Sequence, residues 1–298
     1  MSRLQSWPEP IIRVHELSES GIKKIPENFV KLPSERPSSI TTLSSSSHVE
    51  NIPLIDLENL NSSDESIRDE TMELISKACR EWGFFQVVNH GVSHELMANA
   101  RSVWREFFHL PMDEKQKFAN SPITYEGYGS RLGVVKGAKL DWCDYFFLHY
   151  LPEKLKDENK WPSLPISCRH IIGEYGEKVM KLCERLTKIL SINLGLNEDY
   201  LHTKFGGDNE RGACLRVLSN AIYKSIEHRV IVNSAKERVS LAFFYNPGGD
   251  ILIKPADELV TEERPALYLP MTFNEYRAFI RTKGPCGKSQ VESLKSPR

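Results

Sequence analysis

The fold is decided by residues 225–245, which read SIEHRVIVNSAKERVSLAFFY. The first part, Ser225–Val232, and the last part, Arg238–Tyr245, are rich in the β-branched and aromatic residues that favour strands. Asn233–Glu237 lies between them and is short enough to be a turn. The segment therefore predicts two antiparallel strands joined as a hairpin.

Each predicted strand carries, on one face, side chains that could bind a metal ion or a carboxylate. Because side chains alternate between the faces of a strand, His228 shares an apolar face with Ile226 and Val230. A metal-ligating imidazole would suit that position, and so would a buried histidine bonded to a backbone carbonyl. Arg238 and Ser240 share a face of the second strand, where a guanidinium needs an anion. A bound carboxylate and an internal ion pair both satisfy that need.

Helical patterns dominate the chain before residue 212. Apolar residues recur there at helical spacing, and short runs of strand-forming residues lie between the helices. A helical region followed by a β region predicts an α+β fold rather than an alternation of the two. The predicted helices cover about residues 64–82, 93–108, a short stretch from 111, 165–194 and 274–281, and the further predicted strands cover 51–56, 84–88, 141–150 and 213–217.

The composition is that of an ordinary globular protein. The chain has 298 residues, of which 40% are hydrophobic and 27% charged, and a formal net charge of −1, so it lacks the basic character of a nucleic-acid-binding protein. No apolar run approaches the roughly 18 residues of a membrane span, and the N-terminus has no apolar signal region. The six cysteines show no paired spacing. We therefore expect a cytoplasmic protein with reduced, buried thiols and without membrane or nucleic-acid partners.

Three regions are expected along the chain. Residues 1–50 have little periodicity and end in a stretch rich in serine and threonine, which predicts a flexible N-terminal arm. Residues 51–205 form the helical region. Residues 206–298 form the β region with its closing helix.

The quoted segment resembles a known pair of motifs. Ile226–Val230 followed by Arg238–Ser240 is similar to the distal iron histidine and the Arg-x-Ser clamp of plant Fe(II)/2-oxoglutarate-dependent dioxygenases. Trp82–Gly91 resembles the N-terminal helical region of that family. Within the family the likeness is greatest to the jasmonate-induced oxygenases, because of Ser6–Pro10 and Met271–Phe273.

The resemblance implies a fold and a set of cofactors. The fold would be an N-terminal helical region packed on a double-stranded β-helix, or jelly-roll, core. The cofactors would be Fe(II), 2-oxoglutarate as co-substrate and ascorbate. By resemblance His228 is the distal iron ligand, and Arg238 and Ser240 hold the far carboxylate of 2-oxoglutarate.

The resemblance also implies a small carboxylic acid substrate such as jasmonic acid, which the enzyme would hydroxylate. Arg277 and Arg281 lie four residues apart on one face of the predicted last helix and could grip the substrate carboxylate. A solvated basic face explains the same pair. Arg216 is a third candidate for the substrate carboxylate.

One part of the family pattern is missing. The family holds iron with a His-x-Asp pair and a distant histidine, yet no His-x-Asp occurs in this sequence. The triplet His48–Glu50 is the one His-x-acid sequence, and it lies in the arm that we expect to be flexible. The resemblance places several barrel strands between Val217 and Leu218, where about 70 residues are absent, equal to about half of the barrel.

This gap predicts a truncated jelly roll with exposed strand edges and exposed inner-face residues such as Phe244. A skipped exon and an error in the gene model would both produce such a junction. Three functions stay open: an oxygenase whose missing ligands come from elsewhere, a non-catalytic isoform that interacts with other proteins, and an unstable product. The first predicts iron binding, whereas the other two predict an oxygenase that is impaired or inactive.

Overall fold

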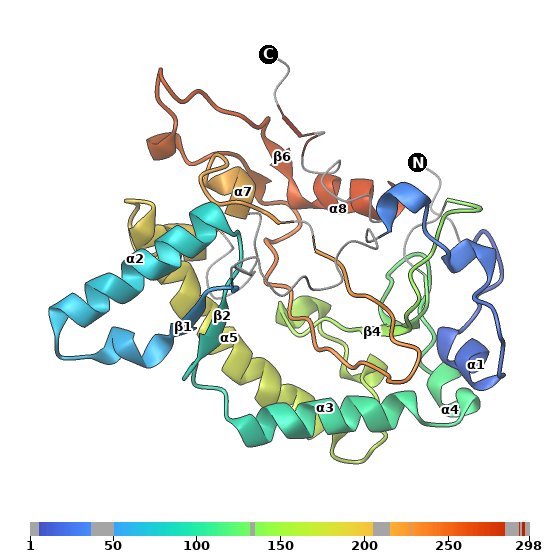
Figure 1. Cartoon of the computed structure of the whole chain (residues 1–298). Coiled ribbons are helices and arrows are strands. Elements are labelled where there is room, and N and C mark those ends of the chain that lie inside the picture. The colour runs from blue at the N-terminus through green and yellow to red at the C-terminus, as the bar shows by residue number, and fades with distance from the viewer. Residues whose placement is uncertain are drawn as a thin grey trace, which may run out of the picture.

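The computed structural model describes residues 6–36, 51–131, 135–204, 215–226, 228–283, 292, 294 and 295. In this part of the chain, long helices form the framework and the strands are short (Figure 1). The α-helices are α1 Val14–Glu19, α2 Glu65–Glu81, α3 His94–Phe108, α4 Met112–Gln116, α5 Cys168–Asn193, α6 Tyr200–Lys204, α7 Leu215–Leu218 and α8 Phe273–Lys283. The strands are β1 Leu54–Asp56, β2 Gln86–Val88, β3 Gly127–Gly129, β4 Tyr145–Phe147, β5 Leu252–Ile253 and β6 Met271–Thr272, and the 3-10 helix η4 covers Leu57–Asn61.

The helices predicted from apolar spacing are confirmed. Helix α2 begins after Asp64, whose side chain accepts a hydrogen bond from the Ser66 N–H at 2.9 Å. Helix α3 begins after Ser93, which caps it through the Leu96 N–H at 3.1 Å. The short helix after Pro111 and the last helix are also present, as α4 and α8. These helices form where predicted because their caps and apolar stripes lie within the helices themselves.

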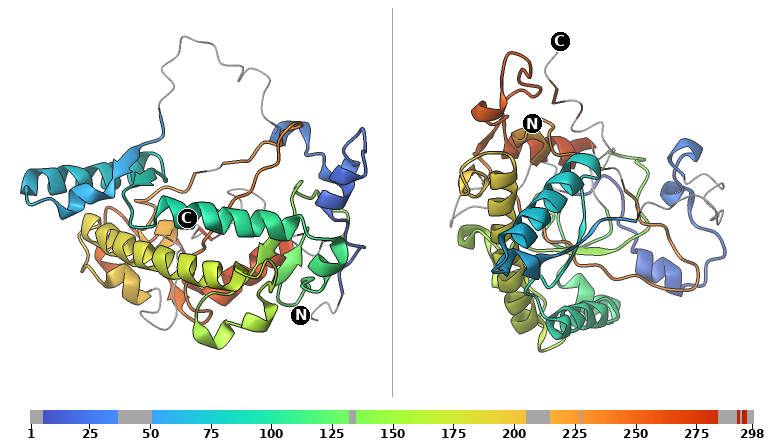
Figure 2. Two further views of the ribbon diagram at one scale, coloured as in Figure 1. Left: turned by 90° about the horizontal axis from the view of Figure 1, so that it is seen from below. Right: turned by 60° about the vertical axis from the view of Figure 1, so that its left-hand side comes forward.

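Helix α5 is the element against which the other long helices pack. Helices α2 and α3 both contact it, and α3 runs beside α5 in both views of the molecule (Figures 1 and 2). One apolar cluster joins α2 and α5 to the C-terminal elements through residues such as Ile75, Leu190 and Tyr223. A second cluster, with Val103 and Cys168 at its centre, fills the space between α3 and α5.

Gly83 joins the C-terminal part of the chain to α2. Its φ of +76° lies in the left-handed region. Its N–H donates to the Ala78 carbonyl at 2.9 Å, which ends the helix. A Cβ at this position would lie 2.7 Å from the Lys224 carbonyl oxygen. The Lys224 N–H in turn donates to the Cys79 carbonyl at 2.9 Å. Glycine is therefore required both by the turn and by the close passage of the Lys224 backbone.

The described residues form three sheets of two strands each. β1 and β2 pair in parallel, with Leu54 opposite Gln86, whereas β3 pairs with β4 and β5 pairs with β6 in antiparallel fashion. The strands expected at 51–56, 84–88 and 141–150 are therefore present in shortened form, as β1, β2 and β4.

The β region differs from the prediction. Within the described residues, Ser225–Val232 and Arg238–Tyr245 belong to no strand or sheet, so the predicted hairpin is wrong. Leu215–Leu218 is helical, so the strand predicted at 213–217 is also wrong over its described part. The described residues form no double-stranded β-helix. A lone hairpin is marginally stable in water and needs a third strand or a packed face. Among the described residues no third strand pairs with the segment, and only its last part, around Phe243 and Tyr245, packs on the core.

The exposure expected from the gap is confirmed. The side chain of Phe244 is 72% exposed and that of Val230 is 62% exposed. Ile231 and Val232 are exposed as well. Figure 1 shows the segment as a long orange loop that reaches toward α4 and returns.

Residues 6–36 of the predicted N-terminal arm pack against the body, which differs from the free arm that we expected. Val14 and Phe29 are buried, and Phe29 meets Trp142 edge to face at a centroid distance of 5.2 Å. Arg131 forms an ion pair with Glu9 at 2.7 Å. The serine-rich end of the arm lies outside the described residues.

Two expectations from composition can be compared with the structure. Cys79 and Cys168 are free and buried, and burial raises the pKa of their thiols to about 11 and about 12. Both thiols are therefore protonated and unreactive at neutral pH. In the described part of the chain, no helix combines the length and apolar character needed to cross a bilayer.

Two glycines in α5 provide a matched test of this packing. A Cβ at Gly176 would lie 2.4 Å from Cε2 of Tyr150, whose hydroxyl is fixed by donation to the Gly173 carbonyl at 3.0 Å. A Cβ at Gly173 would meet nothing within 4 Å. We expect Gly173→Ala to raise the free energy of unfolding by about 1 kcal/mol, and Gly176→Ala to lower it by about 1–3 kcal/mol through the clash. Urea unfolding of both variants measures this, and equal effects would contradict the packing.

Candidate iron and co-substrate site

The segment 225–245, which carries the predicted iron and co-substrate residues, is held at several points, including a hydrogen bond from Arg229 to the Glu35 carbonyl. At its start the Lys224 N–H bonds to the backbone of α2. At its tip Glu237 forms an ion pair with Arg105 at 2.7 Å and accepts a hydrogen bond from Nε2 of His109 at 2.9 Å. At its end Tyr245 is buried in the main core. The segment between these points is exposed, apart from a few partly buried side chains.

His228 lies on an exposed stretch of this segment. Its Nδ1 lies 3.4 Å from the carbonyl oxygen of Ile226, two residues away. The inward-facing position predicted from strand alternation is therefore wrong, because the strand has no sheet behind it. The imidazole faces solvent and is not supported by packing on either side.

Arg238 and Ser240 interact with each other. The Arg238 guanidinium donates to Oγ of Ser240 at 2.8 Å, and both residues are exposed. The expected burial of this guanidinium on an apolar face is wrong for the same reason as for His228. The neighbouring acid Glu237 pairs instead with Arg105 and His109.

The described residues do not fit an iron centre. A facial iron site requires three rigid ligands with supporting contacts. No group of three or more His, Cys, Asp or Glu side chains within the described ranges is placed to hold a metal ion. His228 would be a single, exposed ligand, and His48–Glu50 lies outside the described residues.

The arginines expected to bind the substrate carboxylate have different surroundings in the structure. Arg216 on α7 donates to the Tyr268 hydroxyl at 3.0 Å and to Glu292 at 2.9 Å, so an internal carboxylate already neutralises it. Arg277 on α8 is partly buried, and this burial lowers the pKa of its guanidinium. It lies above the Phe273 ring at 5.9 Å. The side chain of Arg281 lies outside the described residues.

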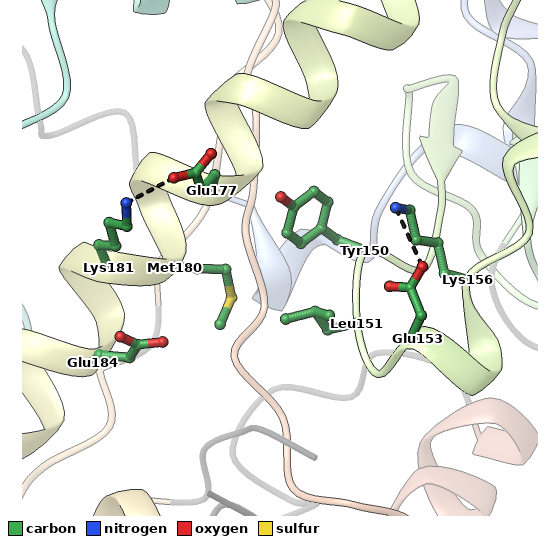
Figure 3. Close-up of a pocket in the computed structure, with 8 residues that line it drawn as sticks. All are labelled: Tyr150, Leu151, Glu153, Lys156, Glu177, Met180, Lys181 and Glu184. Atoms are coloured by element: carbon green, nitrogen blue, oxygen red, sulfur yellow. Dashed lines mark hydrogen bonds and ion pairs between the residues drawn. The ribbon is translucent and has the colours of Figure 1, made fainter. Parts of the chain in front are cut away.

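A hollow that sequence analysis did not predict lies beside α5. Its volume is about 230 Å³, and Tyr150 and Met180 face it from opposite walls (Figure 3). The charged residues at its edge are paired, Lys156 with Glu153 and Lys181 with Glu177. The candidate residues His228, Arg238 and Ser240 do not line it. The hollow lies between residues 150–156 and residues 177–184, so the sequence carries no local signal for it.

Comparison with known proteins gives the family. Residues 52–164 match the profile of the non-haem dioxygenase in morphine synthesis N-terminal region, and residues 204–247 match the 2OG-Fe(II) oxygenase superfamily. Jasmonate-induced oxygenase 2 of Arabidopsis thaliana is 49% identical over 99% of this chain and 96% of its own length. This chain belongs to the jasmonate-induced oxygenase family. Its relatives use Fe(II) and 2-oxoglutarate, as a solved complex shows.

That complex is the crystal structure of JOX2 with 2OG, Fe and JA. It is 47% identical in sequence, covers 98% of this chain and 100% of the JOX2 chain, and has a TM-score of 0.87. Jasmonate-induced oxygenase 3 of Arabidopsis thaliana is 47% identical over 363 positions that take in all of both chains. Because this chain has 298 residues, at least 65 of those 363 positions have no counterpart in it. The size of this gap agrees with the missing strands inferred from the sequence.

The exposure of His228 gives a direct test of its role. Removing an iron ligand should lower metal affinity, whereas removing an exposed side chain that contacts its own backbone should change little. We expect His228→Ala to alter the free energy of unfolding by less than about 0.5 kcal/mol. Chemical unfolding with and without Fe(II) measures both effects. A loss of Fe(II)-dependent stabilisation in the variant would show that His228 is a ligand after all.

Proposed function

We propose that this chain is an impaired jasmonate-induced oxygenase. An intact enzyme of this kind would hydroxylate a small carboxylic acid such as jasmonic acid, with 2-oxoglutarate as co-substrate. In this proposal, the present chain has lost two of the three iron ligands that the reaction needs. The observation that carries the proposal is the exposed, isolated position of His228 in a sequence without any His-x-Asp pair.

The co-substrate residues support the same conclusion. In the proposed intact site, Arg238 and Ser240 would both donate to the far carboxylate of 2-oxoglutarate. Here the Ser240 hydroxyl accepts from Arg238 instead, on a segment open to water. An exposed guanidinium binds a carboxylate weakly, since ion pairs in water contribute at most about 1 kcal/mol.

Succinate production measures the proposed loss of activity. We expect the purified full chain, given Fe(II), 2-oxoglutarate, ascorbate and jasmonic acid, to turn over at less than about one hundredth of the rate of an intact relative, since losing even the partners of metal ligands costs 10–100-fold. Jasmonate-induced oxygenase 2, purified and assayed alongside, is the positive control. Circular dichroism establishes that the chain is folded. Turnover close to that of the relative would overturn the proposal.

A second candidate function is a non-catalytic interaction with other chains. The observation that favours it is the exposed, unpaired backbone of Ser225–Val232 together with the exposed ring of Phe244. Unpaired strand edges with apolar side chains pair readily with strands of other molecules. An intact relative and a second copy of this chain both offer such strands.

Light scattering after gel filtration tests this candidate. We expect the full chain to associate as its concentration rises, and we expect the double substitution Val230→Lys with Phe244→Ser to reduce that association, because it removes two exposed apolar side chains and adds a charge. Leu155→Ser is a matched control, since Leu155 is 45% exposed but belongs to a 3-10 helix outside the segment. Equal association of all three proteins would exclude the segment as the contact surface.

The remaining parts of the proposal concern organisation and location. We propose that residues 51–205 are the N-terminal helical region of the family and that residues 206–298 are what remains of the jelly-roll core. The packing of α2 and α3 on α5 supports the first assignment. We propose a cytoplasmic location, which the unpaired, buried thiols of Cys79 and Cys168 support.

A further inference from the structure

A chain of polar contacts fixes the N-terminal arm to the body. Nδ1 of His15 in α1 lies 3.0 Å from Nζ of Lys115 in α4. The His15 ring also meets the ring of His109 edge to face, with the centroids 5.2 Å apart. His109 in turn contacts the carboxylate of Glu237 at the tip of the exposed segment, and Glu237 forms an ion pair with Arg105. We refer to the contacts from Lys115 through His15 and His109 to Glu237 as the arm clasp.

Lys115 determines the protonation state of His15. The lysine side chain is almost fully buried, at 2% exposed, and its Nζ also donates to the Phe108 carbonyl at 2.8 Å. An ammonium group donates hydrogen bonds and accepts none, so Nδ1 of His15 must be the acceptor. The histidine proton then lies on Nε2, which faces Oε1 of Glu19 at 3.4 Å. The clasp therefore requires a neutral His15.

The remaining charges around His15 act in both directions. Glu19 on its own helix favours a protonated imidazole, and so does Asp144, which accepts from the N–H groups of Val14 and His15 at 2.8 and 3.1 Å. Burial opposes protonation most strongly, followed by the positive charge of Lys115, and together they lower the pKa of His15 below its ordinary value. His109 adds to this opposition.

We propose that the arm clasp is a pH-sensitive device that releases α1 from the body when His15 gains a proton. A protonated Nδ1 cannot accept the hydrogen bond from Lys115, and two positive groups then face each other 3.0 Å apart inside a partly buried contact. Helix α1, which carries His15, has six residues and cannot persist alone. Its release uncovers the surface that Arg13 shares with Tyr128 and Ser130.

The sign of the pH dependence follows from the direction of the His15 shift. Its pKa is lower in the clasped state than in the free arm, so the free arm binds the proton more tightly. The stabilisation from the neutral clasp is fully present above the ordinary histidine pKa of about 6.5. It is lost as the pH falls through and below that value.

Hydrogen exchange of the full chain tests the device. The reporters are α1 amides such as that of Leu17, which donates to the Arg13 carbonyl, and that of Ser20, which donates to the Glu16 carbonyl. We expect their protection factors, corrected for intrinsic exchange, to fall about tenfold between pH 7.5 and pH 5.5. This is the change expected from the loss of one charge-assisted hydrogen bond. Amides in the middle of α5 serve as the internal reference and should keep their protection.

Two variants separate His15 from its neighbours. His15→Asn keeps an acceptor near the Nδ1 position but does not titrate, so we expect its α1 protection to be independent of pH. His170→Asn is the matched control, because His170 is an exposed histidine on α5, and we expect it to behave as the unmodified chain. A fall in protection that persists in His15→Asn would assign the effect to Glu19, Asp144 or His109 and overturn the proposal. An absence of any fall in the unmodified chain would overturn it equally.

Discussion

A strand persists in water only when its backbone groups and one of its faces find partners, and this requirement governs the whole β region. β5 and β6 meet it because they pair with each other beside the main core. The described residues of 225–245 pair with no strand, although their sequence is a better strand former, and only the end around Phe243 and Tyr245 packs on the core. At least 65 of the positions aligned with jasmonate-induced oxygenase 3 have no counterpart in this chain. The described part of the chain keeps His228, Arg238 and Ser240 but has no sheet behind them.

The helical region is preserved because its requirements are met locally. A helix satisfies its backbone within four residues, and α2 and α3 also carry their own capping residues. Their apolar stripes need one common partner, and α5 supplies it. This explains why apolar spacing predicted these helices correctly and predicted the later strands poorly. The strands depend on residues distant in sequence or absent from it, which no local pattern reports.

The candidate site was predictable as a set of residues but not as an arrangement. Sequence alternation placed His228 on an inward face, and that inference holds only for a strand that has a sheet behind it. Arg216 was assigned to a substrate carboxylate, whereas the structure pairs it with Glu292, 76 residues away. The arm clasp was missed for a similar reason. Its contacts join His15 to Lys115 across 100 residues, and the short helix between prolines shows no periodicity that would reveal them.

Glu237 and Arg238 are adjacent in sequence, but only Glu237 contacts residues on or next to an intact helix. The partners of Glu237 are Arg105 and His109 near the end of α3, and that helix is intact, so the carboxylate is held. The partner expected for Arg238 is a ligand inside a closed barrel. The Arg238 guanidinium instead donates to Ser240, and both residues are exposed. A motif carries its chemistry only where the elements that orient it are present. In the described part of this chain, those elements orient the helical region and the arm, whereas His228, Arg238 and Ser240 are exposed.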